Sequence, residues 1–344
     1  MQFRLQKRIE YRASLAEAIF SKAVLGKPGD VRARPLLLAQ AGPDLVAFAA
    51  ETGKELWRAK TGTPPAKRIH PAVLDETVFA LGNDRLIGYT LTGSTRLEIP
   101  VEGVAATSPV PVRLRLLANR TFVVLACANG EVVSFDVLGR KERWRSAVNP
   151  PVDFDLAANE KAVFVPSGGE GIAALGILDG RPIWKAPIPG EAAGDLVIGP
   201  KDDVVGFVTS LGEAYLLSTT DGQVKMRAPL DRARSGAMAL TEDTAFIGTD
   251  DGRLRAVDIA SSTVNWSVAL EGAIRAAPTL SGLNVYVGTD EGRIVCVSAQ
   301  SGRIEWSFDA EAPITASGSV SGGVVVFGTH DGELIGIGLA DSAR

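Results

Sequence analysis

Hydrophobic and polar residues follow a short, repeating pattern along most of the chain. Within residues 274–309, the runs IRAAPTL, NVYVGT, RIVCVS and RIEWSF are separated by Ser-Gly, Asp-Glu-Gly and Gln-Ser-Gly. Short runs of strand-forming residues between such turns are typical of β-hairpins. No long segment has the 3.6-residue periodicity of an amphipathic helix. The pattern therefore predicts an all-β protein in which helices are minor.

The tryptophans show that these hairpins belong to a larger repeat. Leu97 and Met226 stand in the same local context as the tryptophans, and the seven positions are separated by 40, 47, 40, 42, 40 and 40 residues. A unit of about 40 residues with four antiparallel strands is typical of one blade of a β-propeller. The side chains that we expect to fill the space between neighbouring blades are Trp57, Trp144, Trp184, Trp266 and Trp306.

The third strand of the unit occurs eight times, which predicts an eight-bladed β-propeller of four-stranded antiparallel blades. The eighth unit lacks its fourth strand, because its tryptophan would fall near position 346 and the sequence stops at Arg344. In residues 2–12, Phe3, Leu5, Ile9 and Tyr11 occur among polar residues in the pattern of a half-buried strand. We expect this N-terminal strand to complete the last blade and to close the ring, which also removes an open edge.

The predicted organisation is a single domain over residues 1–344, with 2–12 as the closing strand of blade 8. The blades are expected at residues 19–60, 66–100, 104–148, 149–189, 192–229, 232–270, 273–310 and 313–340.

Residues 15–25 allow two interpretations. Ser14 and Glu17 have the spacing of a helix capping box, and Gly26 could end that helix. However, SKAVLG at 21–26 resembles HPAVLD at 70–75, which we take as the innermost strand of blade 2, so a strand is favoured and a helix stays open.

Charge is unevenly distributed in this chain of 344 residues. The net charge is −4, which disfavours a nucleic-acid binder. Yet residues 1–34 hold eight Lys or Arg against three Asp or Glu, and the insertions KPGDVRAR (27–34) and RLRLLANR (113–120) are basic. The N-terminal charge either coats the closing strand or docks an acidic protein or an anionic membrane.

No apolar run is long enough for a membrane span, and none forms a secretory signal. A cytoplasmic location is therefore expected, with a periplasmic one as the alternative if a leader has been removed.

Little in the sequence points to catalysis. Cys127 and Cys296 are far apart and lie in apolar runs, so we expect both to be buried core residues. With only two histidines there is no zinc spacing, and no Ser-His-Asp or Cys-His arrangement can be assigned. We expect no catalytic residue, no metal site and no cofactor.

Two groups of polar residues are candidates for interaction. The turns GTDDG (248–252), GTDEG (288–292) and GTHDG (328–332) place Asp250, Asp290 and His330 on one rim. These residues are either ordinary turn residues or an acidic patch that docks a basic partner or loosely holds a cation.

The second group lies where innermost strands begin. Arg68 and Arg275 precede innermost strands at equivalent points, with His70 nearby and Arg234 one residue out of register. They are either solvated rim charge or a basic channel mouth that binds a carboxylate or an acidic peptide.

The segment Ala256–Trp266 follows a pattern of the form Ala-hydrophobic-Asp-x-x-Thr-Gly-x-x-x-Trp, with Ser-Ser in place of Thr-Gly, and Phe48–Trp57 follows it loosely. This pattern resembles the PQQ-type propeller repeat, a WD40-like bacterial repeat, in its eight-bladed, BamB-like form. The family includes quinoprotein dehydrogenases, which carry an adjacent cysteine pair, a calcium site and a catalytic aspartate. This sequence lacks the adjacent cysteines, so the resemblance implies a propeller that is not an enzyme.

The expected function is a non-catalytic scaffold that binds a protein partner through rim loops or the channel mouth and is a monomer outside that complex. The alternative is a module that binds or senses a small quinone-like or sugar-like ligand.

Overall fold

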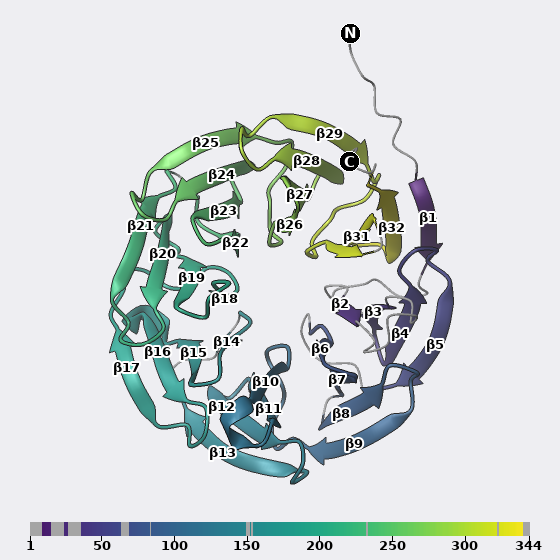
Figure 1. The fold of residues 1–344 in the computed structure, drawn as a ribbon, viewed down its shortest axis with the longest axis vertical. Coiled ribbons are helices and arrows are strands. Elements are labelled where there is room, and N and C mark those ends of the chain that lie inside the picture. Colours follow the sequence, from purple (N-terminus) through teal and green to yellow (C-terminus); the bar gives the residue numbers. More distant parts are fainter. Residues whose placement is uncertain are drawn as a thin grey trace.

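Eight four-stranded antiparallel sheets surround a central channel in the computed structural model (Figure 1). The structure describes residues 9–14, 24–26, 36–62, 69–82, 84–148, 152, 154–231, 233–321 and 323–339. The predicted all-β, eight-bladed propeller is thereby confirmed. The helical structure of the described residues is limited to two 3₁₀ turns, η1 (Arg115–Leu117) and η2 (Gly168–Glu170).

Within blades 1 to 7 the strands run in chain order from the channel to the circumference, and in blade 8 the first strand of the chain takes the outermost place. Blades 1 and 2 consist of β2 (Val24–Gly26), β3 (Leu36–Ala41), β4 (Asp44–Ala49), β5 (Glu55–Lys60), β6 (Ala72–Leu74), β7 (Thr77–Leu81), β8 (Arg85–Thr90) and β9 (Thr95–Pro100). Blades 3 and 4 consist of β10 (Val110–Leu114), β11 (Arg120–Ala126), β12 (Glu131–Asp136), β13 (Lys141–Ala147), β14 (Ala157–Ala158), β15 (Ala162–Pro166), β16 (Ile172–Gly176) and β17 (Pro182–Ala186).

The second half of the ring has the same organisation. Blades 5 and 6 consist of β18 (Val197–Ile198), β19 (Val204–Val208), β20 (Glu213–Ser218), β21 (Val224–Pro229), β22 (Gly236–Leu240), β23 (Thr244–Thr249), β24 (Arg253–Asp258) and β25 (Val264–Ala269). Blades 7 and 8 consist of β26 (Thr279–Ser281), β27 (Asn284–Gly288), β28 (Arg293–Ser298), β29 (Ile304–Asp309), β30 (Ser319–Ser321), β31 (Val324–Gly328), β32 (Glu333–Gly338) and, as the outermost strand, β1 (Ile9–Ser14).

The N-terminal strand β1 pairs with β32 in the register of the other outermost strands. Tyr11 lies opposite Gly336, as Trp306 lies opposite Cys296 in blade 7, and both strands have a bulge one residue earlier. The sequence Ile-Glu-Tyr at 9–11 correspondingly repeats Ile-Glu-Trp at 304–306. Residues 2–8 of the predicted closing strand lie outside the described residues. That this pairing holds the ring closed stays a prediction.

The structure describes three of the residues, 24–26, for which the sequence left a choice between helix and strand. Val24–Gly26 is the short strand β2, and it pairs with β3. Residues 15–23 and the basic insertion 27–34 lie outside the described residues. The second insertion, 113–120, ends β10, forms η1 and begins β11.

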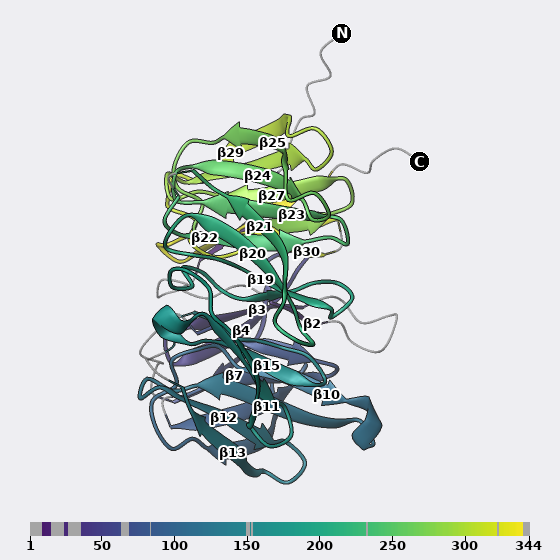
Figure 2. The same ribbon diagram turned by 90° about the vertical axis from the view of Figure 1, so that its left-hand side faces the viewer.

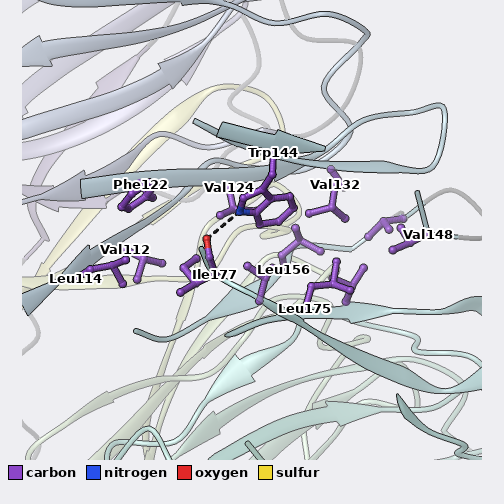
Figure 3. Close-up of a cluster of buried hydrophobic side chains, with 14 residues drawn as sticks. Val112, Leu114, Phe122, Val124, Val132, Trp144, Val148, Leu156, Leu175 and Ile177 are labelled. Carbon is purple, nitrogen blue, oxygen red and sulfur yellow. Dashed lines mark hydrogen bonds between the residues drawn. The ribbon is translucent and has the colours of Figure 1, made fainter. Parts of the chain in front are cut away.

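Neighbouring blades pack through their side chains, with tryptophan at several of the junctions. The indole of Trp144 on β13 lies in a cluster of buried side chains from blades 3 and 4 (Figure 3). Its Nε1 donates a hydrogen bond of 2.8 Å to the Ile177 carbonyl of blade 4. The same bond to the next blade is made by Trp57 to Leu91 O, Trp184 to Thr219 O and Trp266 to Ala299 O.

A glycine of the next blade lies beneath each of these four indoles. Gly180, in the turn before β17, has φ of +66°, and a Cβ there would lie 2.4 Å from the Trp144 ring. Only glycine satisfies both the left-handed backbone and this close approach. The equivalent contacts are Gly93 with Trp57, Gly222 with Trp184 and Gly302 with Trp266.

Two junctions lack both the indole and the glycine. Leu97 replaces tryptophan in blade 2, and the matching turn residue of blade 3 is Arg140, whose Nη2 donates to the Arg96 carbonyl. Met226 replaces tryptophan in blade 5, and the matching residue of blade 6 is Ser262, whose hydroxyl accepts from the Arg227 N–H at 3.4 Å. A side chain is therefore tolerated in the turn where no indole covers it.

Candidate functional site at the channel mouth

The antiparallel topology separates the loops into two sets. Turns between the second and third strands, and the connections from one blade to the next, lie on one face of the ring; the other turns lie on the opposite face. We call the first of these the mouth face. Figure 2 shows the ring edge-on, with the coiled turn beside β10, η1, projecting from the opposite face. The candidate polar residues from the sequence that the structure describes belong to the mouth face.

The central channel begins where the innermost strands start. It encloses about 810 Å³, and small side chains such as Ala106, Ala237 and Ala277 leave it open. His70 and Arg275 both line it, whereas Arg68 lies outside the described residues. Of the four predicted mouth residues, the structure thus places His70 and Arg275 at the channel, and Arg234 is not among the residues that line it.

Four residues at equivalent positions in blades 2 to 5 form a hydrogen-bonded polar belt: His70, Ser108, Asp155 and Asp195. The backbone N–H of His70 donates to Ser108 Oγ at 3.1 Å. The Ser108 N–H donates to Asp155 Oδ1 at 2.7 Å, and the Asp155 N–H donates to Asp195 Oδ1 at 2.9 Å. The side chains of Ser108, Asp155 and Asp195 therefore each satisfy a backbone donor of the preceding blade, and these bonds link four blades around one side of the channel.

Asp155 is the centre of this polar belt. Its Oδ2 lies 2.7 Å from His70 Nε2, so the carboxylate contacts blades 2 and 3 together. Burial alone would raise the pKa of Asp155, but the hydrogen bonds and charge of His70 and the Ser108 N–H outweigh burial and lower it. Asp155 is therefore held as a carboxylate.

The polar belt brings serine, histidine and aspartate together, although the sequence alone allowed no such arrangement to be assigned. Ser108 Oγ accepts from the backbone of His70, while the ring atom Nδ1 of His70 is buried without a hydrogen-bond partner. A nucleophilic serine needs its hydroxyl within hydrogen-bond reach of the base. The observed hydrogen bonds attach one blade to the next and do not activate the Ser108 hydroxyl as a nucleophile.

The two candidate groups from the sequence are joined in blade 7. Asp290 accepts the Ala273 N–H at 2.6 Å with Oδ1 and pairs with Arg275 at 3.2 Å with Oδ2. In blade 6, Asp250 accepts the N–H of Arg234 at 2.9 Å. These aspartates cap the connection that leads into their own blade, a contact between two loops rather than within one hairpin turn.

His330 occupies the matching position in blade 8. The residue that would be capped there is Pro313, which has no N–H to donate. The His330 N–H donates to the Pro313 carbonyl at 2.8 Å, just as the Asp290 N–H donates to the Ala273 carbonyl at 3.0 Å. An aspartate at position 330 would have no backbone N–H from which to accept a hydrogen bond. This explains why the repeat can carry a histidine there.

Sequence reasoning missed Ser108, Asp155 and Asp195. Two of them stand in a repeated Asp-Leu dipeptide, at 155–156 and again 40 residues later at 195–196. Each dipeptide comes immediately before the innermost strand of blade 4 or 5, and this repetition could have revealed them. Nothing in the spacing shows that His70, far away in sequence, bonds to Asp155.

The cysteine prediction is confirmed, since Cys127 and Cys296 are free and buried. Burial raises the pKa of Cys127, so its thiol is a poor nucleophile. Within the described ranges, no group of three or more His, Cys, Asp or Glu residues could hold a metal ion. No helix in the described part of the chain is long and apolar enough to cross a membrane.

The blades, their indole–glycine contacts and the open channel define a class: an eight-bladed β-propeller built from PQQ-like repeats. The family described as "Outer membrane protein assembly factor BamB" matches residues 41–126, 128–227 and 212–344. The chain belongs to this family.

Solved structures agree with this fold. BamB from Moraxella catarrhalis is 13% identical, with a TM-score of 0.74 over 98% of this chain and 99% of that one. The computationally designed Ika8 protein is 17% identical, with a TM-score of 0.78 over 95% of this chain and 98% of that one. At these identities the likeness shows the fold alone. No curated protein matches this chain in sequence.

Proposed function

We propose that this chain is a non-catalytic scaffold that docks a protein partner on the face opposite the channel mouth, over blades 3 and 4. The observation that carries the proposal is a group of exposed leucines. Leu116 at the tip of η1 is 97% exposed and Leu138, before β13, is 75% exposed. Leu117 and Leu178 are exposed on the same face of the same two blades. Large apolar side chains gathered on one face are typical of protein-interaction sites.

The arginines around η1 do not make this surface basic. Arg113 pairs with Asp75 of blade 2, Arg115 with Glu160 of blade 4 at 3.1 Å, and Arg120 with Asp136 of its own blade. These ion pairs hold the projecting turn between its neighbours and neutralise its charge. The arginines of the insertion are thus paired with carboxylates, and Leu116 is its most exposed apolar side chain.

The polar groups at the mouth face also support a scaffold. The belt carboxylate Asp155 and the turn carboxylates Asp250 and Asp290 each accept backbone N–H groups. Groups used in this way stabilise the ring and are less available for chemistry.

Site-specific photo-crosslinking in the native host tests the proposal. A photoreactive residue at Leu116 should give one discrete adduct, whereas Leu283, which is 82% exposed on the same face of blade 7, should give none. The purified partner should then bind the native chain and lose at least about tenfold in affinity with Leu116→Ser/Leu138→Ser. Equal adducts from both positions, or unchanged affinity of the double variant, would contradict the proposal.

A second candidate function, small-ligand binding, is favoured by the open channel of about 810 Å³ and by the unpartnered Nδ1 of His70 on its wall. Native mass spectrometry and the absorbance spectrum of the purified protein test it. A bound small molecule, or a melting temperature that rises with added PQQ and calcium, would support this function. A colourless protein whose melting temperature does not change with PQQ or calcium would count against it.

A further inference from the structure

The outermost strands leave one unpaired edge on each blade. Because such edges can pair with other chains, natural proteins protect them with charged residues or proline. Seven of the eight outermost strands that the structure describes follow this rule, each with at least one charged residue. The exception is β25 of blade 6, Val-Asn-Trp-Ser-Val-Ala at 264–269, which has neither charge nor proline.

The surroundings of β25 leave its outer edge accessible. It is the end strand of its sheet and lies on the circumference of the ring (Figure 1). Trp266 bonds to Ala299 O of blade 7, and Val268 packs against the same cluster, so the strand is held firmly on its inner side. Asn265, Ser267 and Ala269 are exposed and uncharged. Arg253, on the inner strand β24, donates a hydrogen bond of 3.4 Å to Ser267 Oγ.

We propose that the outer edge of β25 binds an extended, uncharged segment of a partner polypeptide by β-strand addition. Main-chain hydrogen bonds along such an edge supply affinity, and alternate side chains supply specificity. An uncharged segment fits because β25 itself offers no countercharge to a charged one. Val264, 44% exposed, and the half-buried Trp266 offer apolar contacts beside the backbone.

A second copy of this chain fits the edge less well. A stable pair of rigid proteins buries roughly 800 Å² on each partner, over about 20–30 residues a side. Two rings that meet edge to edge at a convex circumference share little more than one six-residue strand. An extended segment avoids this limit because it follows the strand along its whole length.

This site is separate from the leucine surface over blades 3 and 4, and it rests on the proposed function only in that its ligand is a polypeptide. The two proposals can therefore fail independently. Loss of the crosslink at Leu116 leaves the β25 test unchanged, and a failure at β25 leaves the leucine surface in place.

Hydrogen exchange with a defined peptide tests the proposal. The probe is Ac-Val-Thr-Val-Thr-Val-Thr-NH2, added to the full chain at millimolar concentration. We expect exchange to slow about threefold or more in residues 264–269 and to stay unchanged in the equivalent strand 304–309 of blade 7. The charged peptide Ac-Val-Lys-Val-Lys-Val-Lys-NH2 should protect less.

Matched substitutions separate the edge from general effects. Ser267 and Ser307 follow the tryptophans of β25 and β29 at equivalent, exposed positions. Ser267→Lys should abolish the protection of residues 264–269 by the peptide, while Ser307→Lys should leave it unchanged, because a lysine blocks pairing only at the strand edge that carries it. Absent protection, equal protection of 304–309, or an unaffected Ser267→Lys variant would overturn the proposal. Protection that rises with protein concentration without peptide, together with a doubled mass, would overturn it in favour of a second copy.

Discussion

Two kinds of junction hold neighbouring blades together. At four junctions an indole lies over a glycine of the next blade and bonds to one of its carbonyls, as with Trp144, Gly180 and Ile177. At two others a smaller side chain faces a turn that keeps its own side chain, Leu97 with Arg140 and Met226 with Ser262. The comparison teaches that tryptophan and glycine form one contact across two blades.

The largest loss of stability is expected when the indole is removed from a junction of the first kind. Trp144 is 8% exposed, so Trp144→Ala should lower the free energy of unfolding by about 3–5 kcal/mol. Trp144→Phe keeps an aromatic ring but loses the hydrogen bond, and should cost less. Equilibrium urea unfolding measures both. A loss below about 1 kcal/mol for the alanine variant would show that the indole is not what holds this junction.

The junction between blades 8 and 1 has tyrosine at the tryptophan position. Tyr11→Pro removes a backbone donor from β1 and should cost about 2–3 kcal/mol if the pairing with β32 closes the ring. Tyr11→Phe is the control, since it leaves the backbone intact. Unchanged thermal and urea unfolding of the proline variant would argue that closure by β1 contributes nothing.

The turn glycine gives a sharper contrast. Gly180→Ala places a Cβ against the Trp144 ring at positive φ and should cost about 2 kcal/mol. Ser262→Ala, at the same turn position beside Met226, already has a Cβ and should change stability by less than about 0.5 kcal/mol. Similar losses in the two variants, measured by urea unfolding, would remove the distinction between the junctions.

A double-mutant cycle can convert one kind of junction into the other. Met226→Trp alone should be poorly accommodated beside Ser262, whereas Met226→Trp/Ser262→Gly recreates the indole–glycine pair. We expect a favourable coupling of about 1–2 kcal/mol between the two substitutions. Additive effects in urea unfolding would mean that the pair seen elsewhere in the ring is not energetically coupled.

The smallest expected effect depends on pH and concerns the polar belt. The folded-state pKa of Asp155 is lowered, so its stabilisation is fully present above the unfolded pKa of about 3.9 and is lost as pH falls through the folded value. Asp155→Asn should therefore cost about 1 kcal/mol at pH 6 and progressively less below pH 4. The cost of Trp144→Ala should stay constant over the same range, because neither partner titrates. A pH-independent cost of Asp155→Asn would contradict this account.

The architecture was predictable because it depends on local sequence patterns that recur from blade to blade. Turn residues, β-branched runs and the spacing of tryptophans gave the class, the number of blades and the buried cysteines. The match between Ile-Glu-Tyr at 9–11 and Ile-Glu-Trp at 304–306 was also available in the sequence as a signal for the register of β1.

The sequence by itself determined which residues form strands and how often the unit repeats, because those properties depend on neighbours a few residues apart. Only the tertiary structure decided which repeats meet. It placed Gly180 under Trp144, His70 against Asp155, and Arg275 against Asp290. These contacts depend on how neighbouring sheets stack around the channel. A side chain's role at such a contact is set by the blade beside it rather than by its own repeat.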